Sequence, residues 1–473
     1  MILPSPNEIA GLPTKEQEML AKLLEVWEDK LTRNKLQEDY YNAKNRLKDM
    51  GIAIPPALQK FEMVVGWPAK AVDSLAVRAR FDGFITTDEN SFMDDVLEYN
   101  HFKILYQQAE TSELTHSCSF LTVTAEDRGE EHPRIIMSAY TATDAAALWD
   151  RRHKRIKCGM AVVDGIRDPK TDDFEPTWVN LYTDDAVWEI KKTDTGWTSK
   201  RNRHSMGRPT MEPLVYRPSL SRPFGKSRIN RAVISITDEA VRTTLRSAVA
   251  AEFHTSPQKY LLGAEDTLFE DNSTWEAYIG NIFAISKDED GDVPQFGQLP
   301  QGSMQPHIDY MRSLAARFSG ETSIPLSELG IVSDNPSSAE AIYAAKESLV
   351  IEAESVNETN GEALKVIGRM AIAFFLDKPL EELTPEEADI VPHFRNPAMP
   401  SIVSQADAMV KVVTPPGASW IAETDVYLEQ MGFDEATRRR MLKEKRLIQG
   451  REMAAAILSS RSTEASDGAA VER

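Results

Sequence analysis

A short motif, FGKS at residues 224–227, comes closest to known enzyme chemistry in this sequence of 473 residues. A Gly-Lys-Ser sequence ends the phosphate-binding loop of nucleotide-hydrolysing proteins, in which backbone amides and the lysine hold the phosphates. That loop also requires a glycine five positions before its second glycine, and here that position holds Leu220. Because this glycine is missing, we expect no nucleotide hydrolysis at the motif.

Residues that could bind a metal or transfer protons are scattered. The eight histidines form no HExxH pattern, and the two cysteines, Cys118 and Cys158, form no CxxC pair and no disulfide framework. His116 with Cys118 could supply only part of the four ligands that a structural zinc needs. No recognisable acid-base pair of carboxylates and no Ser/His/Asp triad can be inferred. We therefore expect no catalytic site, no metal and no cofactor.

Charged residues instead gather in clusters. Residues 198–231 hold nine Lys or Arg against the single Glu212, and residues 263–292 hold nine Asp or Glu against the single Lys287. These segments are either two solvated surfaces or surfaces that face each other across the subunits of a ring. Another basic cluster could contact DNA phosphates or form a plain solvated helix face. It consists of Arg438, Arg439, Arg440, Lys443, Lys445 and Arg446.

The overall charge also limits the function. A formal net charge of −20 argues against a protein that wraps nucleic acid in a generally basic surface. Neutralising many phosphates would hold DNA in place, so an acidic or neutral wall suits a conduit through which DNA slides. The longest apolar run, residues 370–376, is too short to span a membrane, and no leader pattern precedes the first helix. We expect a protein that is soluble when it is made.

The elements that carry these residues begin with helices over residues 14–116. Thr14 and Gln17 have the spacing of a capping box at the first helix start. Pro68 should bend or restart a second helix, since proline cannot continue the hydrogen-bond ladder. A third helix is expected over about residues 91–116.

A β-rich block follows the helices. Residues 119–198 alternate β-branched and aromatic runs with turn-rich segments, which predicts antiparallel strands. Residues 199–227 are interpreted as a basic, proline-containing linker. Two further helices are predicted over residues 228–254 and 301–319, and the segment between them contains strand-like runs and an acidic stretch.

The clearest start signal belongs to the longest predicted helix. Pro336 suits the first turn or the residue before it, and Ser337 with Glu340 forms an S-x-x-E capping box. Helical spacing continues to Phe375, which gives about 55–60 Å at roughly 1.5 Å per residue. Because much of its surface is small or polar, we do not expect one compact core to bury this helix. We expect it to span a large assembly.

Several segments, spread in order over nearly the whole chain, carry a further signal. They are Trp27, Tyr40 with Tyr41, GIAIPP at 51–56, WPAKAVDSLAVR at 67–78, Gly83 with Phe84, RPFGKSRIN at 222–230, AAEFHTSPQKYLLG at 250–263 and SIPLSELGIVSDNPSSAEAI at 323–342. In this order, and in a chain of this length, they resemble the portal protein of long-tailed double-stranded DNA bacteriophages.

The resemblance implies an α+β fold, the phage portal fold with wing, stem, clip, helical crown and a long tunnel helix. Its parts map onto the chain as follows: wing 1–227, first stem helix 228–254, clip 255–300, second stem helix 301–319, tunnel loop 320–335, tunnel helix and wing return 336–399, crown 400–458 and tail 459–473. The tail has almost no large apolar residues, so we expect it to be disordered.

The resemblance also suggests which residues meet partners. Candidates to face DNA lie on the tunnel loop, where glycines would supply flexibility unless the loop is only a rigid connection. They are Gly320, Ile324, Pro325, Leu326, Ser327, Glu328 and Gly330. Candidates for docking of other proteins lie on the clip. They are Glu265, Asp266, Glu270, Asp271, Trp275, Asp288, Glu289 and Asp290.

A non-enzymatic ring, a dodecamer in the virion, is the assembly that the resemblance implies. It would form the channel at one capsid vertex through which viral DNA is packaged and ejected. The implied partners are a terminase motor, a head-tail adaptor, the major capsid and scaffold proteins and double-stranded DNA that passes through non-specifically, with no membrane. The protein would be made in the host cytoplasm and end in the virion.

Two other functions stay open at this stage. A helical scaffold that binds a protein partner without forming a conduit would also use long amphipathic helices, and its oligomeric state would distinguish it. A divergent packaging NTPase would need nucleotide hydrolysis by the purified chain, which the glycine missing at Leu220 argues against.

Overall fold

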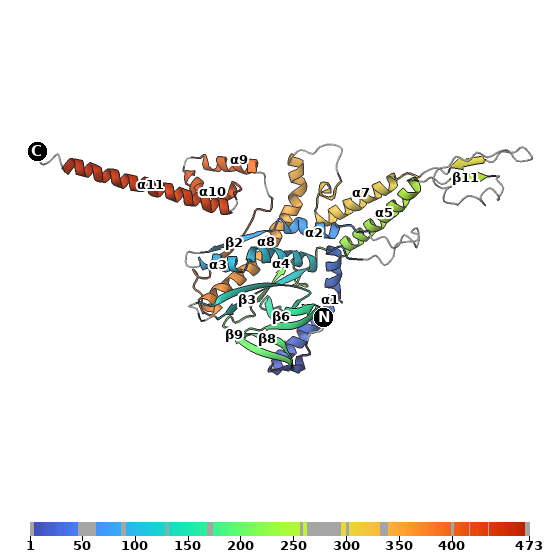
Figure 1. The fold of residues 1–473 in the computed structure, drawn as a ribbon, viewed down its shortest axis with the longest axis horizontal. Helices are drawn as coiled ribbons and strands as arrows, with labels where there is room; N and C mark the ends of the chain where they lie inside the picture. Colours follow the sequence, from blue (N-terminus) through green and yellow to red (C-terminus); the bar gives the residue numbers. More distant parts are fainter. Residues whose placement is uncertain are drawn as a thin grey trace, which may run out of the picture. The chain divides into compact units, whose positions relative to one another are not determined.

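The computed structural model describes most of the chain and divides it into two units, residues 1–397 and 398–473. Figure 1 shows the fold along the sequence. The described residues are 4–45, 63–86, 91–127, 129, 132–167, 174–255, 259–262, 295–298, 302–331, 339–398, 402–415, 417–433 and 435–468. Each unit is described by itself.

The first helix, α1 (Thr14–Tyr41), begins one residue earlier than a capping box with Thr14 as its N-cap would require. Pro13 takes the N-cap position in an extended conformation, so Thr14 is already helical and makes no cap. The Gln17 side chain donates from Nε2 to the Leu12 carbonyl oxygen at 2.8 Å. The predicted Thr14/Gln17 capping box is therefore wrong, although the predicted helix start is confirmed.

The next helices confirm one prediction and correct another. Helix α2 (Trp67–Ala76) carries Pro68 in its first turn, where the missing amide proton costs no hydrogen bond. The single helix predicted over 91–116 is two helices, α3 (Phe92–Tyr99) and α4 (Phe102–His116). His101 separates them because its φ of +47° is left-handed and cannot continue a right-handed helix.

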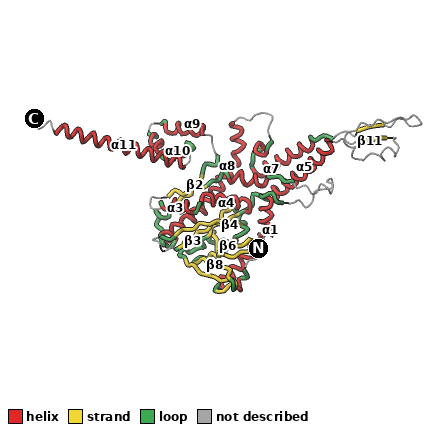
Figure 2. Tube along the Cα trace, viewed as in Figure 1, coloured by secondary structure: helices red, strands yellow, loops and turns green. Residues whose placement is uncertain are grey.

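The β-rich block forms two sheets (Figure 2). The larger has the order β1-β9-β8-β7-β6-β5, antiparallel except for the parallel pair β1–β9, and the smaller has the order β10-β3-β4. The strands are β1 (Ile9–Ala10), β3 (Cys118–Glu126), β4 (Arg134–Thr141), β5 (Ala145–Asp150), β6 (Arg155–Arg167), β7 (Phe174–Tyr182), β8 (Ala186–Thr193), β9 (Gly196–Arg203) and β10 (Met211–Val215). The strands predicted within 119–198 are confirmed.

Residues 199–227, predicted as a linker, are largely built into the fold. They include the end of β9 and all of β10, whose five residues are buried. Because proline cannot donate to a sheet ladder, Pro213 argued against a strand here. Among the described strands β10 pairs with β3 alone, so Pro213 lies in an edge strand, where proline is tolerated.

Two helices lie side by side beyond this block, α5 (Arg231–Thr255) and α7 (Gln305–Thr322) (Figure 1). Asn230 caps α5, since its Oδ1 accepts from the backbone N–H groups of Ala232 (2.8 Å) and Val233 (3.0 Å). The helices therefore start three and four residues later, and end one and three residues later, than the predicted 228–254 and 301–319. An antiparallel strand pair between them consists of β11 (Lys259–Leu262) and β12 (Gln295–Gln298).

The longest helix of the first unit, α8 (Ala339–Phe375), passes through two hydrophobic cores. Leu349, Ala353 and Val356 belong to one core with α2, α5 and α7. Leu364 and Ile367 belong to another with α4, the smaller sheet and the pair β2 (Phe81–Thr86) and β13 (Ile390–Phe394). As expected, no single core buries this helix. Two cores of the same chain bury different parts of it.

The second unit is helical. It contains α9 (Ile402–Val413), the 3₁₀ turn η7 (Ser419–Glu423), α10 (Asp425–Gln430) and α11 (Glu435–Gly468). Helix α11 continues through most of the tail that we expected to be disordered, which corrects that prediction up to Gly468. The tail is poor in apolar residues but lacks proline, and its alanine, glutamate and arginine residues favour helix.

No helix within the described residues is long and apolar enough to cross a membrane.

Candidate functional site

Of the predicted tunnel loop, 320–335, the structure describes residues 320–322 as the end of α7 and residues 323–331 as the segment that follows it. Its first residues hold it in place: Ile324 is fully buried in the core around α2, α5 and α7, and Pro325 is buried beside it. These two candidates therefore anchor the loop and present no side chain to a ligand in this arrangement. Gly320, a further candidate, lies within α7 rather than in the loop.

The remaining loop candidates form a short exposed turn. Leu326 is 38% exposed and Ser327 is exposed, within the 3₁₀ turn η5 (Leu326–Leu329). Backbone bonds close the turn, from the Glu328 N–H to the Pro325 carbonyl (2.9 Å) and from the Ile331 N–H to the Leu326 carbonyl (3.2 Å). Gly330 ends it with a left-handed φ of +82°, which glycine adopts without strain.

Glu328 joins this turn to helices on either side. Its carboxylate lies 3.4 Å from Lys70 Nζ of α2 and 3.6 Å from Lys346 Nζ of α8. Arg78, just beyond α2, contributes a third cation at 3.8 Å. The Glu328 side chain is only about one-fifth exposed, so its carboxylate is engaged in contacts within the chain and is not a free acidic group.

A hollow of about 410 Å³ lies between α7 and the loop, and Leu329, Gly330 and Ile331 help to line it.

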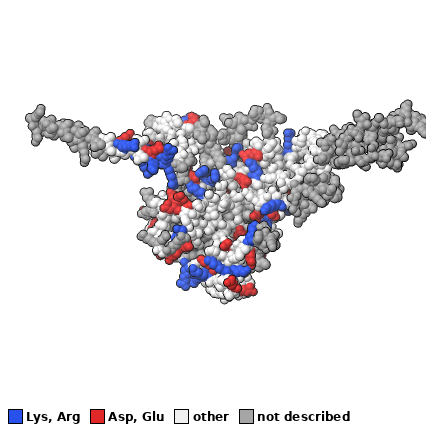
Figure 3. Space-filling model, in the orientation of Figure 1, with Lys and Arg blue, Asp and Glu red and all other residues white. Residues whose placement is uncertain are grey.

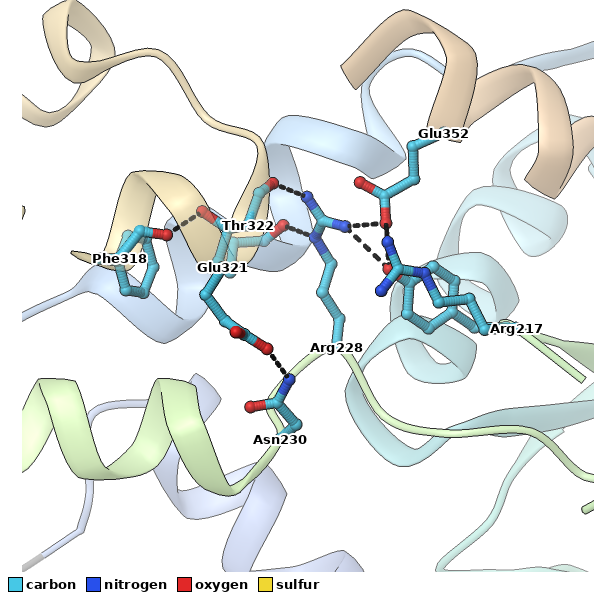
Figure 4. A network of polar contacts seen from close by, with 9 residues as sticks. Arg217, Arg228, Asn230, Phe318, Glu321, Thr322 and Glu352 are labelled. Carbon is cyan, nitrogen blue, oxygen red and sulfur yellow. Dashed lines mark hydrogen bonds and ion pairs between the residues drawn. The ribbon is translucent and has the colours of Figure 1, made fainter. Parts of the chain in front are cut away.

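Behind the loop, one buried arginine connects the elements that carry it (Figure 4). The Arg228 guanidinium donates from Nε to the carbonyl of Ala71 in α2 at 2.5 Å and from NH2 to the carbonyl of Thr322 at the end of α7 at 2.6 Å. It also forms an ion pair with Glu352 of α8, with 2.7 Å between NH1 and Oε1. Since the Arg228 side chain is 3% exposed, these contacts fix three helices at one point.

Glu352 is the acidic centre of this network. Its Oε1 also lies 2.6 Å from NH2 of Arg217 and accepts a hydrogen bond from the Tyr216 hydroxyl. Tyr216 in turn accepts from Arg228 NH1 at 2.9 Å. Burial is the main cause that raises the pKa of Tyr216 to about 12, so this phenol stays protonated and can donate. The carboxylate thus has two arginines and one hydroxyl around it.

The FGKS motif has a structural use next to this network. Gly225 has a φ of +69°, and a Cβ at that position would overlap the Tyr216 carbonyl oxygen. The Ser227 hydroxyl donates to the Thr115 carbonyl at 2.5 Å and accepts from the Ile229 N–H at 2.9 Å. The motif therefore fixes the backbone conformation that places the Arg228 side chain in the protein interior.

Other predicted site residues lie outside the described part of the chain. This holds for Pro336 and Ser337 of the predicted capping box; Glu340 lies in α8, which begins at Ala339. It also holds for every clip candidate, namely Glu265, Asp266, Glu270, Asp271, Trp275, Asp288, Glu289 and Asp290. Within the described residues, no group of three or more His, Cys, Asp or Glu side chains could hold a metal ion.

The basic cluster on α11 is partly neutralised by its own unit. Arg438 is buried and lies 2.9 Å from Asp425 and 3.0 Å from Glu429 of α10. Lys445 lies 3.3 Å from Glu423. The cluster is therefore not one uniform basic face. Its remaining members are exposed, with Arg440 3.1 Å from Glu444. They are Arg439, Arg440, Lys443 and Arg446.

Basic residues of the segment 198–231 also have acidic neighbours within the chain. Arg201 pairs with Asp185, Arg208 pairs with Glu212, and Arg217 and Arg228 share Glu352. On the face shown in Figure 3, basic and acidic side chains lie interspersed. Part of the positive charge that could face another subunit is therefore already compensated inside this one.

The sequence alone does not reveal Arg228 and Glu352 as a pair. Arg228 belongs to a basic segment, and Glu352 is one of several acidic residues on a long helix. The signal that could have found them is the segment RPFGKSRIN itself, which places an arginine directly before the helix cap Asn230. Only the fold brings Glu352 to that point.

Comparison with known proteins identifies the family. Residues 20–416 match the family described as "Phage portal protein, SPP1 Gp6-like", and because this match covers most of the sequence, the chain belongs to that phage portal family. The chain is 26% identical over 425 residues to the portal protein of Mycobacterium phage L5, covering 87% of this chain and 84% of the relative. The same identity and coverage hold for the portal protein of Mycobacterium phage D29.

Solved structures give weaker similarity. A chain in the neck of a native GTA particle, computed with C12 symmetry, has a TM-score of 0.41 at 12% identity, covering 80% of this chain and 89% of that one. A chain in the virion of a native gene transfer agent particle has the same TM-score and identity, covering 81% and 95%. The family assignment therefore rests on the sequence match.

Proposed function

We propose that this chain assembles into a closed ring that lines a channel at one capsid vertex, through which double-stranded DNA is packaged and ejected. The proposal is supported by membership of the phage portal family over residues 20–416. The single structural observation that favours it is the loop of residues 323–331, a short exposed turn held on a buried base between two long helices.

The construction of this loop suits contact with a moving polymer. Leu326 and Ser327 are presented at the surface, while Ile324, Pro325 and the Arg228 network hold the loop from behind. Neither exposed side chain is basic, so the turn would touch DNA without neutralising phosphates and holding it. The hollow beside Gly330 leaves room for the outer side of the turn to shift.

The other parts take the roles that portal proteins of this architecture would need. Helices α5 and α7 would form the stem, and residues 255–300 between them the clip, where a terminase motor and later a head-tail adaptor would dock. The second unit, residues 398–473, would form the crown. The ring would be a dodecamer in the virion and would contact the major capsid and scaffold proteins.

The proposed role is structural rather than enzymatic. The one motif with a likeness to a nucleotide site, FGKS, is used to shape the backbone at Gly225 and to bind Thr115 through Ser227. The energy for DNA translocation would therefore come from the terminase motor.

Oligomeric state is the first test. We expect native mass spectrometry and negative-stain class averages of the purified chain to show closed rings of about a dozen subunits with a central hole, since a heterologous interface must close to form a ring. A stable monomer or dimer, also in the presence of scaffold protein, would overturn the proposal and favour a partner-binding scaffold.

The loop itself is tested by packaging. We expect Leu326→Asp combined with Ser327→Asp to leave rings intact but to reduce the DNA packaged, because the added charges would repel the phosphates. The control is Ser219→Asp, at an exposed turn outside the loop, which should package normally. Normal packaging by the loop variant would exclude a DNA contact at this turn.

A further inference from the structure

Two acidic side chains lie buried where α4 crosses α8. Glu110 and Glu113 stand one helical turn apart on α4, and both are 0% exposed. Asn360 of α8 is also 0% exposed, and its Nδ2 donates to Glu113 Oε2 at 2.7 Å and to the Tyr106 hydroxyl at 3.1 Å. The cluster is therefore the polar contact between the two helices.

Most oxygen atoms of this cluster have no hydrogen-bond partner among the described residues. They are both carboxyl oxygens of Glu110, Oε1 of Glu113 and Oδ1 of Asn360. A buried ionised carboxylate without partners costs so much free energy that the group instead takes up a proton. The geometry alone thus favours the neutral acids.

Charged and titratable neighbours do not change this balance. Among the described residues, the cation that acts on Glu110 is Arg80, which is exposed and donates to Gln107 Oε1 at 3.3 Å. The other groups near the pair are neutral, namely Tyr106, Cys118 and Asn360. His116, one turn beyond Glu113 on α4, is also neutral, since burial lowers its pKa to about 4. Burial raises the pKa of Glu113 to about 8, and burial with the neighbouring Glu113 raises the pKa of Glu110 well above its usual value.

We propose that Glu110 and Glu113 form a proton-binding site at the α4–α8 crossing, and that movement of α8 away from α4 releases these protons to solvent. Each acid that meets water loses one proton and becomes a carboxylate, so the movement and the proton release are one linked equilibrium. A rise in pH would favour the separated helices. The site rests on contacts within one chain and does not depend on ring assembly.

The proton site lies on α8 between the two hydrophobic cores that this helix joins. Asn360 lies between Val356, which belongs to the core with α2, α5 and α7, and Leu364, which belongs to the core with α4 and the smaller sheet. The N-terminal part of α8 leads back to the loop of residues 323–331. Any movement of the loop that displaces α8 would therefore also displace Asn360 from Glu113.

Infrared spectroscopy of the purified full-length chain tests the protonation directly. At pH 7 the wild-type chain should show the C=O band of buried protonated carboxylic acids, and Glu110→Gln should lose part of that band. The matched control is Glu358→Gln, an exposed position on α8, which should leave the band unchanged. A wild-type spectrum without the band, or a band that Glu110→Gln leaves intact, would overturn the proposal.

Unfolding as a function of pH tests the linkage. From about pH 5 to 8 the unfolded chain has ionised glutamates while the native chain keeps its protons, so each group raises the unfolding constant tenfold per pH unit. Glu110→Gln and Glu113→Gln should each remove one such dependence, and should be more stable than wild type at pH 8. For Glu113 the dependence should level off above pH 8, where the native group also ionises.

The same experiment identifies the competing explanation. If a divalent cation occupied the four oxygens instead of protons, Ca²⁺ or Mg²⁺ would raise the unfolding temperature of the wild-type chain, a chelator would lower it, and both Gln variants would be destabilised. That combination would overturn the proton site, whereas insensitivity to both metals and chelator, together with stabilised Gln variants, would support it.

Discussion

Two buried polar clusters hold α8, and they neutralise charge in different ways. At Glu352, two arginines and a tyrosine hydroxyl contact Oε1 of the carboxylate, so opposite charge compensates it. Among the described residues, Glu113 has one hydrogen-bond partner, the Asn360 amide of α8, and Glu110 has none, so protons must compensate. The first cluster should hold its geometry at any moderate pH, while the second should respond to pH.

The difference between the two clusters distinguishes contacts of α8 that should not depend on pH from contacts that should. Arg228 reaches α2, α7 and α8 with directed hydrogen bonds, and breaking them would leave a buried charge unpaired. At the α4–α8 crossing the Asn360 amide donates to Glu113 and to the Tyr106 hydroxyl. Under the proposal above, water that reaches these acids ionises them, so this polar contact, unlike the Arg228 network, weakens as the pH rises.

The largest effect should come from Arg228→Met, which removes the compensating charge but keeps a long apolar side chain. Glu352 would remain buried with one exposed arginine, and the Ala71 and Thr322 carbonyls would lose their donor. We expect a loss of about 3–5 kcal/mol in the free energy of unfolding, measured by urea denaturation. Arg217→Met, whose side chain is 59% exposed, should cost less than about 1 kcal/mol. Equal losses would show that the network does not depend on burial.

The next effect should come from Asn360→Leu, which changes the proton site while keeping side-chain volume. Glu113 and the Tyr106 hydroxyl would lose their shared partner, so we expect a cost of about 1–3 kcal/mol at pH 7. Equilibrium unfolding followed by circular dichroism measures it. A stabilised variant would mean that the amide contributes nothing to the crossing.

A smaller effect should separate two glycines near the loop. Gly330→Ala places a Cβ in open space but at a φ of +82°, and should cost about 1 kcal/mol. Gly320→Ala, also in open space but inside α7, should stabilise by roughly 0.5–1 kcal/mol. Unfolding temperatures of both variants test this, and a shift of the same sign at both positions would contradict the assigned backbone. Gly330→Pro cannot adopt this φ and would disrupt the turn itself.

The smallest effect should come from Glu328→Gln, because its three ion pairs, at 3.4 to 3.8 Å, are long and partly exposed. We expect a loss below about 1 kcal/mol at low salt that disappears at high ionic strength, since salt screens exposed charges. Thermal unfolding at two salt concentrations measures it. A loss that persists in high salt would place Glu328 with the fixed contacts rather than the weak ones.

The order of the elements could be predicted from the sequence because local signals define it. Pro68 marks the start of α2, and the alternation of strands across 119–198 is confirmed. Burial within loops could not be predicted in the same way. Ile324 and Pro325 lie in a segment rich in turn residues, and only the packing of α2, α5 and α7 shows that they point inward.

The site residues show the same limit. Exposed candidates such as Leu326 and Ser327 could be found from their place between two helices. The partners of Arg228 could not, because its hydrogen-bond acceptors come from α2, α7 and α8, which are far apart in sequence. Likewise Glu110 and Glu113 look like ordinary helix surface residues in the sequence, and only the fold shows that both are buried and that Glu113 meets Asn360 of α8.

The passage of α8 through two hydrophobic cores has a consequence for cooperativity. A helix that supplies Leu349 to one core and Leu364 to the other cannot leave either without exposing apolar surface in both. The two cores should therefore not open as independent units in hydrogen exchange. The residues that line these two cores should lose their protection together, as one foldon whose shared member is this helix.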